Sequence, residues 1–413
     1  MAKDVHPPRG MRDFLPVEKL KRDRVLNSIR DTYKSHGFQE IETPALEDLS
    51  RLTSGQGGDN EKLAFRVMKR GAELEAGLGK VAAGVSSEDE VDALADLGLR
   101  YDLTVPLTRY YATNRTSLPS VFKAIQTGPV WRAERPQKGR YRQFVQCDID
   151  IIGDASELAE VELLVASLDA LAGIGLSDAV IRVNHRALLS ASIAALGVAP
   201  SDALSAMITI DKLDKINVDG VAAELNTKFG AEVAAAATAW LNSLAGAAVP
   251  AELESLFATV GGLHPGKLRY DATLVRGMGY YTGSIFEIEH PGSGSSIGGG
   301  GRYDGMVGRW LGTDVPAVGI SIGFERAVDL VADADGAERA VVLVLDSSEP
   351  AVTANALAVQ RQAIAAGWSA RLEVRPKKLG NLLESLTAQG FTTWAAVGLE
   401  PVSFDALELR PLA

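Results

Sequence analysis

The segment from Gly128 to Gly153, GPVWRAERPQKGRYRQFVQCDIDIIG, limits what this chain can form more than any other stretch of its sequence. Two apolar-patterned runs flank a loop rich in arginine and lysine, which predicts two strands folded back on each other. Successive side chains of a strand point to opposite faces. The second strand should therefore separate three apolar from three polar side chains: Cys147, Ile149 and Ile151 from Gln146, Asp148 and Asp150.

The polar wall of this predicted hairpin suits a charged ligand. Arg132 and Glu134 share a face of the first strand, so that arginine, carboxylates and an amide can line one wall. Such a wall can hold a polyphosphate together with an ammonium group. A sheet with one buried and one solvated face would show the same alternation. The loop favours a binding site, because Arg132 to Arg142 contains five bases and one acid.

Composition bounds the class of protein. The 413 residues exceed one ordinary core, so two or three domains are expected. The formal net charge of −11 argues against indiscriminate nucleic-acid binding but is compatible with local basic patches. A single cysteine and five scattered histidines give no disulfide and no metal-ligand spacing, so no metal ligands are assigned. With no membrane-length apolar run and no signal-peptide core, we expect a cytoplasmic protein that does not enter a membrane.

Element patterns predict three parts. A helix from Pro16 to Gly37, a strand over 38–43 and a strand over Leu99–Leu103 belong to the first part. An alanine-rich stretch over about 183–262 predicts a helical insertion, either a packing module or an RNA-contacting one. After a linker at 331–338, strands alternate with helices, which predicts a small α/β domain with parallel pairing over 339–413.

Four segments carry a family resemblance. Arg132 to Glu134 followed by RPQKGRYRQF (135–144) resembles motif 2 of class II aminoacyl-tRNA synthetases, and this run is characteristic of the histidyl-tRNA synthetase family. LVRGMGYYTGSIFE (274–287) and IGGGGRYDG (297–305) are similar to two signatures of that family, and VGISIGFER (318–326) is similar to motif 3. Gly279 stands where the family often has aspartate.

The resemblance, which covers nearly the whole chain from Pro8, implies the fold. It implies an α+β class II catalytic domain over 1–330, in which an antiparallel sheet is flanked by helices and the helical insertion is included. The C-terminal α/β domain is implied to bind the anticodon. The helix and strand that precede Pro44 look like class II motif 1, which implies a homodimer.

The resemblance also implies site residues. Arg132 and Arg276 would be catalytic at the α-phosphate. ATP would be bound by four residues: Arg132, Glu134, Arg140 and Arg326. Histidine would be bound by eight: Asp102, Thr104, Gln146, Asp150, Arg276, Tyr280, Tyr281 and Tyr303. Among these, Asp150 is the candidate partner of the imidazole N–H.

The implied activity is ligation of histidine to tRNA. ATP, with Mg²⁺ on its phosphates, and L-histidine would form histidyl-adenylate, and histidine would then pass to the 3′ end of tRNA(His). Two alternatives remain: a histidine-binding regulatory subunit of ATP phosphoribosyltransferase, and a tRNA-sensing module without catalysis. The retained Arg132, Arg276 and Arg326, and the sequence that continues past Arg326, favour the enzyme.

Overall fold

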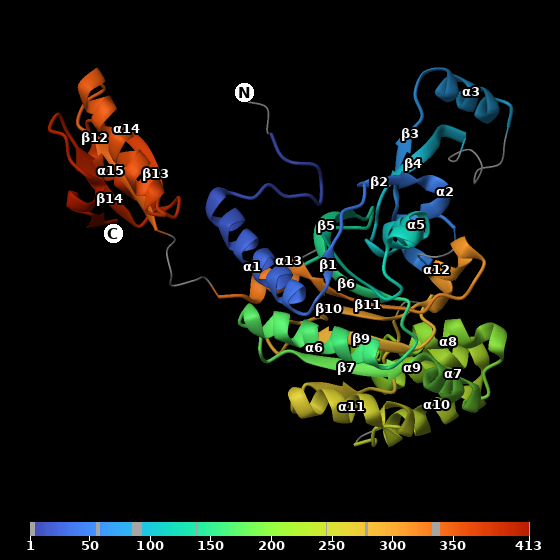
Figure 1. Ribbon diagram of the computed structural model, residues 1–413. Coiled ribbons are helices and arrows are strands. Elements are labelled where there is room, and N and C mark those ends of the chain that lie inside the picture. Colours follow the sequence, from blue (N-terminus) through green and yellow to red (C-terminus); the bar gives the residue numbers. More distant parts are fainter. Residues whose placement is uncertain are drawn as a thin grey trace. The chain divides into compact units, whose positions relative to one another are not determined.

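The computed structural model describes residues 5–54, 58–84, 93–136, 139–244, 246–276, 280–332 and 339–412. The chain divides into two compact units (Figure 1): Met1–Arg12 with Val25–Val331, and Asp13–Arg24 with Ala332–Ala413. Among the described residues, none of the helices combines the length and the apolar character that crossing a membrane requires.

An eight-stranded sheet forms the centre of the larger unit, with the strand order β1-β5-β6-β11-β10-β9-β7-β8. Pairing is antiparallel from β5 through β7, which confirms the predicted sheet, and the outer pairs β1–β5 and β7–β8 are parallel. The strands span Gln39–Glu40 (β1), Phe122–Trp131 (β5), Gln143–Ile152 (β6), Ala317–Gly323 (β11), Gly298–Arg302 (β10), Ser284–Glu289 (β9), Val180–His185 (β7) and Leu268–Tyr270 (β8).

The predicted hairpin is present as β5 and β6. Ten residue pairs join the strands, from Phe122 opposite Ile152 to Trp131 opposite Gln143. The alternation along β6 is confirmed, because Cys147, Ile149 and Ile151 belong to the main hydrophobic core.

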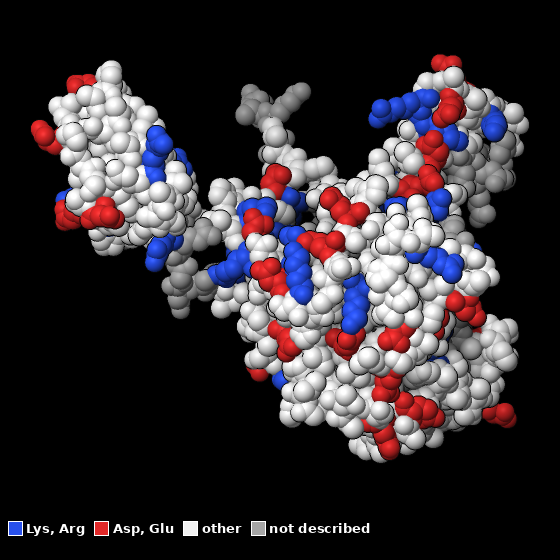
Figure 2. Space-filling view, viewed as in Figure 1, with Lys and Arg blue, Asp and Glu red and all other residues white. Residues whose placement is uncertain are grey.

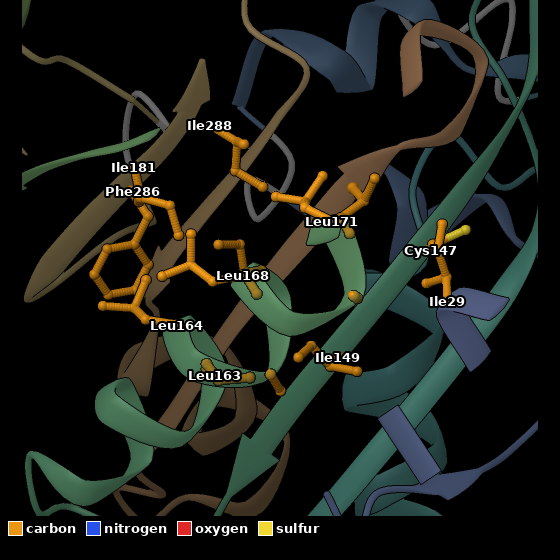
Figure 3. Packing of buried hydrophobic residues seen from close by; sticks show 14 of the residues in the cluster. Ile29, Cys147, Ile149, Leu163, Leu164, Leu168, Leu171, Ile181, Phe286 and Ile288 are labelled. Carbon is orange, nitrogen blue, oxygen red and sulfur yellow. The ribbon is translucent and has the colours of Figure 1, made fainter. Parts of the chain in front are cut away.

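Helices cover the apolar face of this sheet. They are α1 (Pro16–Ser35), α6 (Leu158–Gly173), α11 (Ala251–Leu263) and α13 (Phe324–Leu330). In Figure 3, Leu164 and Leu168 of α6 point toward strand residues such as Phe286. Each fully buried aliphatic or aromatic side chain of this kind stabilises the fold by about 1.5–3 kcal/mol. The predicted helix from Pro16 is confirmed, and Gly37 follows it with φ +82°.

A second core lies around α5 (Thr104–Asn114) and α12 (Asp304–Leu311). Here the predicted strand Leu99–Leu103 is wrong beyond its first residue. Strand β4 (Ala95–Leu99) ends at Leu99, because the Asp102 carboxylate accepts a hydrogen bond from the Val105 N–H at 3.1 Å and opens α5. The predicted strand over 38–43 is paired as a strand only at Gln39–Glu40.

The remaining elements of the larger unit form a small layer at its edge. Strand β4 lies between β2 (Leu46–Asp48) and β3 (Phe65–Met68) in a three-stranded sheet. Helices α2 (Leu49–Leu52) and α3 (Gly71–Ala82) accompany it. Residues 71–98 therefore contribute a helix and a strand to this layer.

Four helices share a core of their own: α7 (Arg186–Ala195), α8 (Ala203–Ile210), α9 (Leu213–Phe229) and α10 (Ala231–Ser243). They correspond to the predicted insertion, but the ends of the interval 183–262 do not belong with them. Val183 lies in β7 of the main sheet, and α11 packs its Leu253, Leu256 and Val260 into the main core. Helical spacing continues through α11, so the sequence pattern alone could not separate the two.

The smaller unit is an α/β layer with the strand order β13-β12-β14-β15. Its central strand β12 is parallel to both neighbours, which confirms the predicted parallel pairing. The elements are β12 (Ala340–Leu345), α14 (Pro350–Ala365), β13 (Ser369–Val374), α15 (Leu379–Thr387), β14 (Thr393–Val397) and β15 (Arg410–Pro411).

The division of the chain differs from the expected break at 330 in one respect. Residues 13–24, which include the first turns of α1, group with the smaller unit. A 20-residue helix is about 30 Å long, so its two ends can belong to different units. Residues 333–338 of the expected linker lie outside the described residues.

The close packing of β10 against β11 can be tested by a substitution at Gly300. A Cβ at this position of β10 would lie 2.6 Å from the Ile320 Cα and closer still to the Gly319 carbonyl oxygen. We expect Gly300→Ala to lower the free energy of unfolding by about 3 kcal/mol or more, because backbone atoms cannot move aside cheaply. Gly305→Ala in α12, where nothing lies within 4 Å of the added Cβ, is the matched control. Urea unfolding with equal midpoints for the two variants would contradict this packing.

Candidate active site

One cleft of about 880 Å³ in the larger unit contains every site residue that the sequence predicted. The twelve come from segments far apart in the chain: Asp102, Thr104, Arg132, Glu134, Arg140, Gln146, Asp150, Arg276, Tyr280, Tyr281, Tyr303 and Arg326. The cleft lies on the face of β6 opposite the main core. The arrangement thus follows from the alternation along that strand, together with the loops that follow β5 and precede β9.

Buried carboxylates form part of its wall. Asp150, which is 3% exposed, accepts a hydrogen bond from the Tyr303 hydroxyl at 2.6 Å. Burial raises the pKa of Asp150 to about 7, although the Tyr303 bond acts against this rise. The Asp150 carboxyl can therefore exist in either protonation state near neutral pH.

Asp148 is a cleft residue that the sequence analysis did not assign to a ligand. It is 4% exposed, and burial followed by repulsion from Asp150 holds its pKa well above the usual range. Within the described part of the chain, its Oδ1 atom is buried without a hydrogen-bond partner. The signal was present in the sequence, because Asp148 alternates with Gln146 and Asp150 on the polar face of β6.

Asp102 and Arg132 both line the cleft and interact electrostatically. Asp102 is held by the first turn of α5, where Thr104 is the first helical residue, and burial raises its pKa. Arg132 donates from Nε to the Tyr101 carbonyl oxygen at 3.0 Å and lies over the Phe144 ring at 5.0 Å. The positive charge of Arg132 counteracts the rise in the pKa of Asp102.

Arg276 reaches the cleft from the loop before β9. Its Nη1 donates to the Gly298 carbonyl oxygen at 2.9 Å and more weakly to that of Phe286 at 3.4 Å. Its Nε lies 3.4 Å from Glu287 Oε2. The guanidinium can pass this close to β10 because Gly299 lacks a Cβ, which would overlap it. Gly279, the departure from the family pattern, lies outside the described residues.

Arg326 and Arg140 add positive charge nearby. Arg326, on the motif 3 helix α13, donates to the Ser296 carbonyl oxygen, and its pKa is lowered by burial and by the charges of Arg140 and Arg276. Arg140 is half-exposed and lies 3.5 Å from Glu134. Arginines that repel one another in one cleft are a site for a polyanion, because bound phosphates would relieve the repulsion.

Two tyrosines complete the pocket near Tyr303. The rings of Tyr280 and Tyr281 lie 4.3 Å apart between centroids and are inclined by 56°. Burial raises the pKa of both hydroxyls, so they remain neutral hydrogen-bonding groups. The Asp150–Tyr303 pair beside them offers both a donor and an acceptor to a small polar ring.

The N-terminal segment braces the loop between β5 and β6. The Arg142 N–H donates to the Gly10 carbonyl oxygen at 2.7 Å, and Arg12 lies over the Tyr141 ring at 3.8 Å. Arg12 also donates to Glu325 Oε2 at 2.7 Å, while Glu325 Oε1 accepts from the Val145 N–H at 3.2 Å. No local pattern in the sequence predicts this brace, because its partners are hundreds of residues apart.

Charged side chains are mixed on the outer surface as well (Figure 2). On the visible face in Figure 2, basic and acidic side chains of the larger unit are interspersed rather than segregated. No uniformly basic face is therefore visible among the described residues of the larger unit in Figure 2.

Comparisons with known proteins identify the family. A family model described as histidyl-tRNA synthetase matches residues 10–78 and 88–327. The histidine–tRNA ligase of Leifsonia xyli subsp. xyli is 50% identical over 440 aligned positions, which cover 100% of this chain and 99% of that protein. The chain belongs to the histidyl-tRNA synthetase family. The resemblance seen in the sequence and the class II fold are both confirmed.

Solved structures agree with the fold. The crystal structure of histidyl-tRNA synthetase from Nostoc sp. PCC 7120 superimposes with a TM-score of 0.76 at 25% identity, covering 99% of this chain and 97% of that one. A Bacillus halodurans C structure, described as an ATP phosphoribosyltransferase regulatory subunit/histidyl-tRNA synthetase, gives 0.72 at 19% identity, with 95% and 97% covered. Below 25% identity such a likeness shows the fold alone.

The raised pKa of Asp150 predicts a pH dependence of stability. Between the usual aspartate range and about pH 7, the folded state keeps a proton that the unfolded state has lost, so stability falls as pH rises to about 7. From about pH 5 to 7 this loss should be about 2 kcal/mol. We expect Asp150→Asn to remove it in urea unfolding measured at several pH values, whereas Asp178→Asn, at an exposed position, should not. Identical pH profiles of stability for the Asp150 variant and the wild type would show that Asp150 does not cause this loss.

Proposed function

We propose that this chain is a histidine–tRNA ligase. It would join L-histidine to ATP as histidyl-adenylate, release pyrophosphate, and pass histidine to the 3′ end of tRNA(His). One observation carries the proposal: arginines that suit a polyphosphate and buried carboxylates that suit an amino acid share one cleft. The 50% identity to a named histidine–tRNA ligase over the full chain supports it independently.

Activation requires attack of the histidine carboxylate on the α-phosphorus of ATP. Both reactants are anionic and negative charge builds on the phosphate oxygens, so catalysis depends on alignment and on fixed positive charge. We assign Arg132 and Arg276 to the α-phosphate, where charge develops, and Arg326 to the γ-phosphate. Glu134 and Arg140 would contact ATP from the loop between β5 and β6.

Histidine would lie against β6 and α5. Asp102, Thr104 and Gln146 are assigned to its polar groups, with Asp102 as an anion for the α-ammonium. When ionised, Asp150 would accept the imidazole N–H, while Tyr303, Tyr280 and Tyr281 enclose the ring. A site that hydrogen-bonds a buried group rejects analogues that lack it by large factors.

Further assignments rest on the same proposal. Mg²⁺ at such sites is bound by phosphate oxygens and by one or two carboxylates. Glu134 lines the cleft and would supply a carboxylate ligand, and the ion would neutralise charge on the phosphates. A homodimer and a cytoplasmic location are the family-based expectations that we retain. We assign catalysis to residues 1–330, an acceptor-stem role to the helices α7 to α10, and anticodon binding to residues 339–413.

A regulatory role in ATP phosphoribosyl transfer is less well supported. The structure described with that name shares the fold at 19% identity, so the fold does not separate the two functions. Arg132, Arg276 and Arg326 all line the cleft, as an ATP-using enzyme requires. A histidine sensor would have no need of all three.

The test is histidine-dependent ATP–pyrophosphate exchange by the purified protein, with the other amino acids as controls. We expect exchange with histidine alone, and a loss of about 10²- to 10³-fold in Arg276→Ala, because one fixed charge at the reacting phosphate is missing. Arg309→Ala, at an exposed position on α12 outside the cleft, should exchange normally. Histidine binding without exchange in the wild type would favour the regulatory role instead.

A further inference from the structure

Glu287 lies between two arginines. This β9 residue lines the cleft, and its side chain is 18% exposed. Its Oε2 atom lies 3.4 Å from Arg276 Nε, and its Oε1 atom lies 3.1 Å from Arg182 Nη1. One carboxylate thus joins an arginine assigned to catalysis with another arginine on the neighbouring strand.

Arg182 is a firm anchor for this carboxylate. It is 8% exposed on β7, directly opposite Glu287 in the antiparallel register, where opposite charges stabilise strand pairing. Its guanidinium also binds Asp271, at 2.6 Å through Nε, and Glu289, at 3.0 Å through Nη1. Since four carboxylates, including that of Asp214 at 3.6 Å, lie within ion-pair range of Arg182, its own position does not depend on Glu287 alone.

Arg276 has a weaker set of contacts. Apart from Glu287 it donates to the carbonyl oxygens of Gly298 and Phe286, both through Nη1. Within the described ranges, Glu287 is the only carboxylate in ion-pair range of Arg276. Nε and Nη1 therefore face protein groups, while no hydrogen bond or ion pair within the described residues involves the remaining nitrogen, Nη2.

We propose that Glu287 is a positioning residue that holds the Arg276 guanidinium with Nη2 available to the α-phosphate. This inference rests on the proposed function and assigns Glu287 no contact with substrate. Arg182 pairs with one oxygen of the carboxylate, and the other oxygen lies near Arg276. A guanidinium displaced by about 1 Å from its productive position can cost on the order of 10²-fold in rate.

Glu287→Gln and Glu289→Gln make a matched pair for the test. Both residues lie on β9 and both bind Arg182 Nη1, but only Glu287 also reaches Arg276 and lines the cleft. An amide is neutral, so the side chain introduced by Glu287→Gln cannot form an ion pair with either arginine as the carboxylate does. We expect kcat of histidine-dependent exchange to fall about 10- to 100-fold in Glu287→Gln with little change in KM. Glu289→Gln should stay within about twofold of wild type.

A double-mutant cycle separates positioning from a general structural role. If Glu287 acts through Arg276, combining Glu287→Gln with Arg276→Lys should reduce kcat no further than Arg276→Lys alone. Glu287→Asp, which keeps the charge, should restore part of the rate and carries the same cycle if the amide variant does not fold. Rates are to be normalised to active sites by adenylate burst.

Three results would overturn the inference. These are equal losses in Glu287→Gln and Glu289→Gln, additive losses in the cycle, and a higher Mg²⁺ requirement in Glu287→Gln, which would make Glu287 a metal ligand. A wild-type protein without exchange would instead remove the proposed function, so the two failures are distinguishable.

Discussion

The pairing of β6 with β5 on one side and β11 on the other determines both the core and the cleft. Because side chains alternate along a strand, this pairing sends Ile149 and Ile151 beneath the helices and Asp148 and Asp150 to the opposite face. A slip of one residue would exchange the two sets, placing carboxylates in the apolar core. Selection for a packed core therefore also fixes the geometry of the polar wall, and the two cannot vary independently.

The cleft contains two sets of charged groups that cost free energy to place there, namely buried carboxyl groups and neighbouring arginines. Burial raises the pKa of Asp102, Asp148 and Asp150, which lie in the wall of the cleft. A bound cation would lower these pKa values and so favour the ionised carboxylates. Arg276 and Arg326 are held by carbonyl oxygens and lie close enough that their charges interact. Under the proposed function, the amino acid would bring positive charge to the carboxyl groups and the nucleotide would bring negative charge to the arginines. Binding both substrates would thus offset the cost of burying the carboxyl groups and the repulsion among the arginines.

Much of this architecture was predictable from the sequence because its signals are local. The β5–β6 hairpin, helix α1 and the parallel strands around β12 follow from periodicity. The twelve residues predicted for the site, which all line one cleft, followed from the family resemblance. The strand predicted through Leu103 failed because the Asp102 side chain competes with backbone pairing, a contact that periodicity does not reveal. Glu287 and Arg182 were missed because their importance depends on register between strands 105 residues apart in sequence. Asp148 was visible in the alternation, but no motif gave it a role.

The brace from Arg12 to Glu325 has a consequence for synthesis on the ribosome. The two residues are 313 positions apart, so at about 5–20 residues per second Arg12 waits about 15–60 s for its partner. Until then the loop between β5 and β6 lacks this support, and β11, which completes the sheet beside β6, is also absent. A nascent chain would therefore gain support for the loop between β5 and β6 late, at nearly the same time as the motif 3 segment is synthesised.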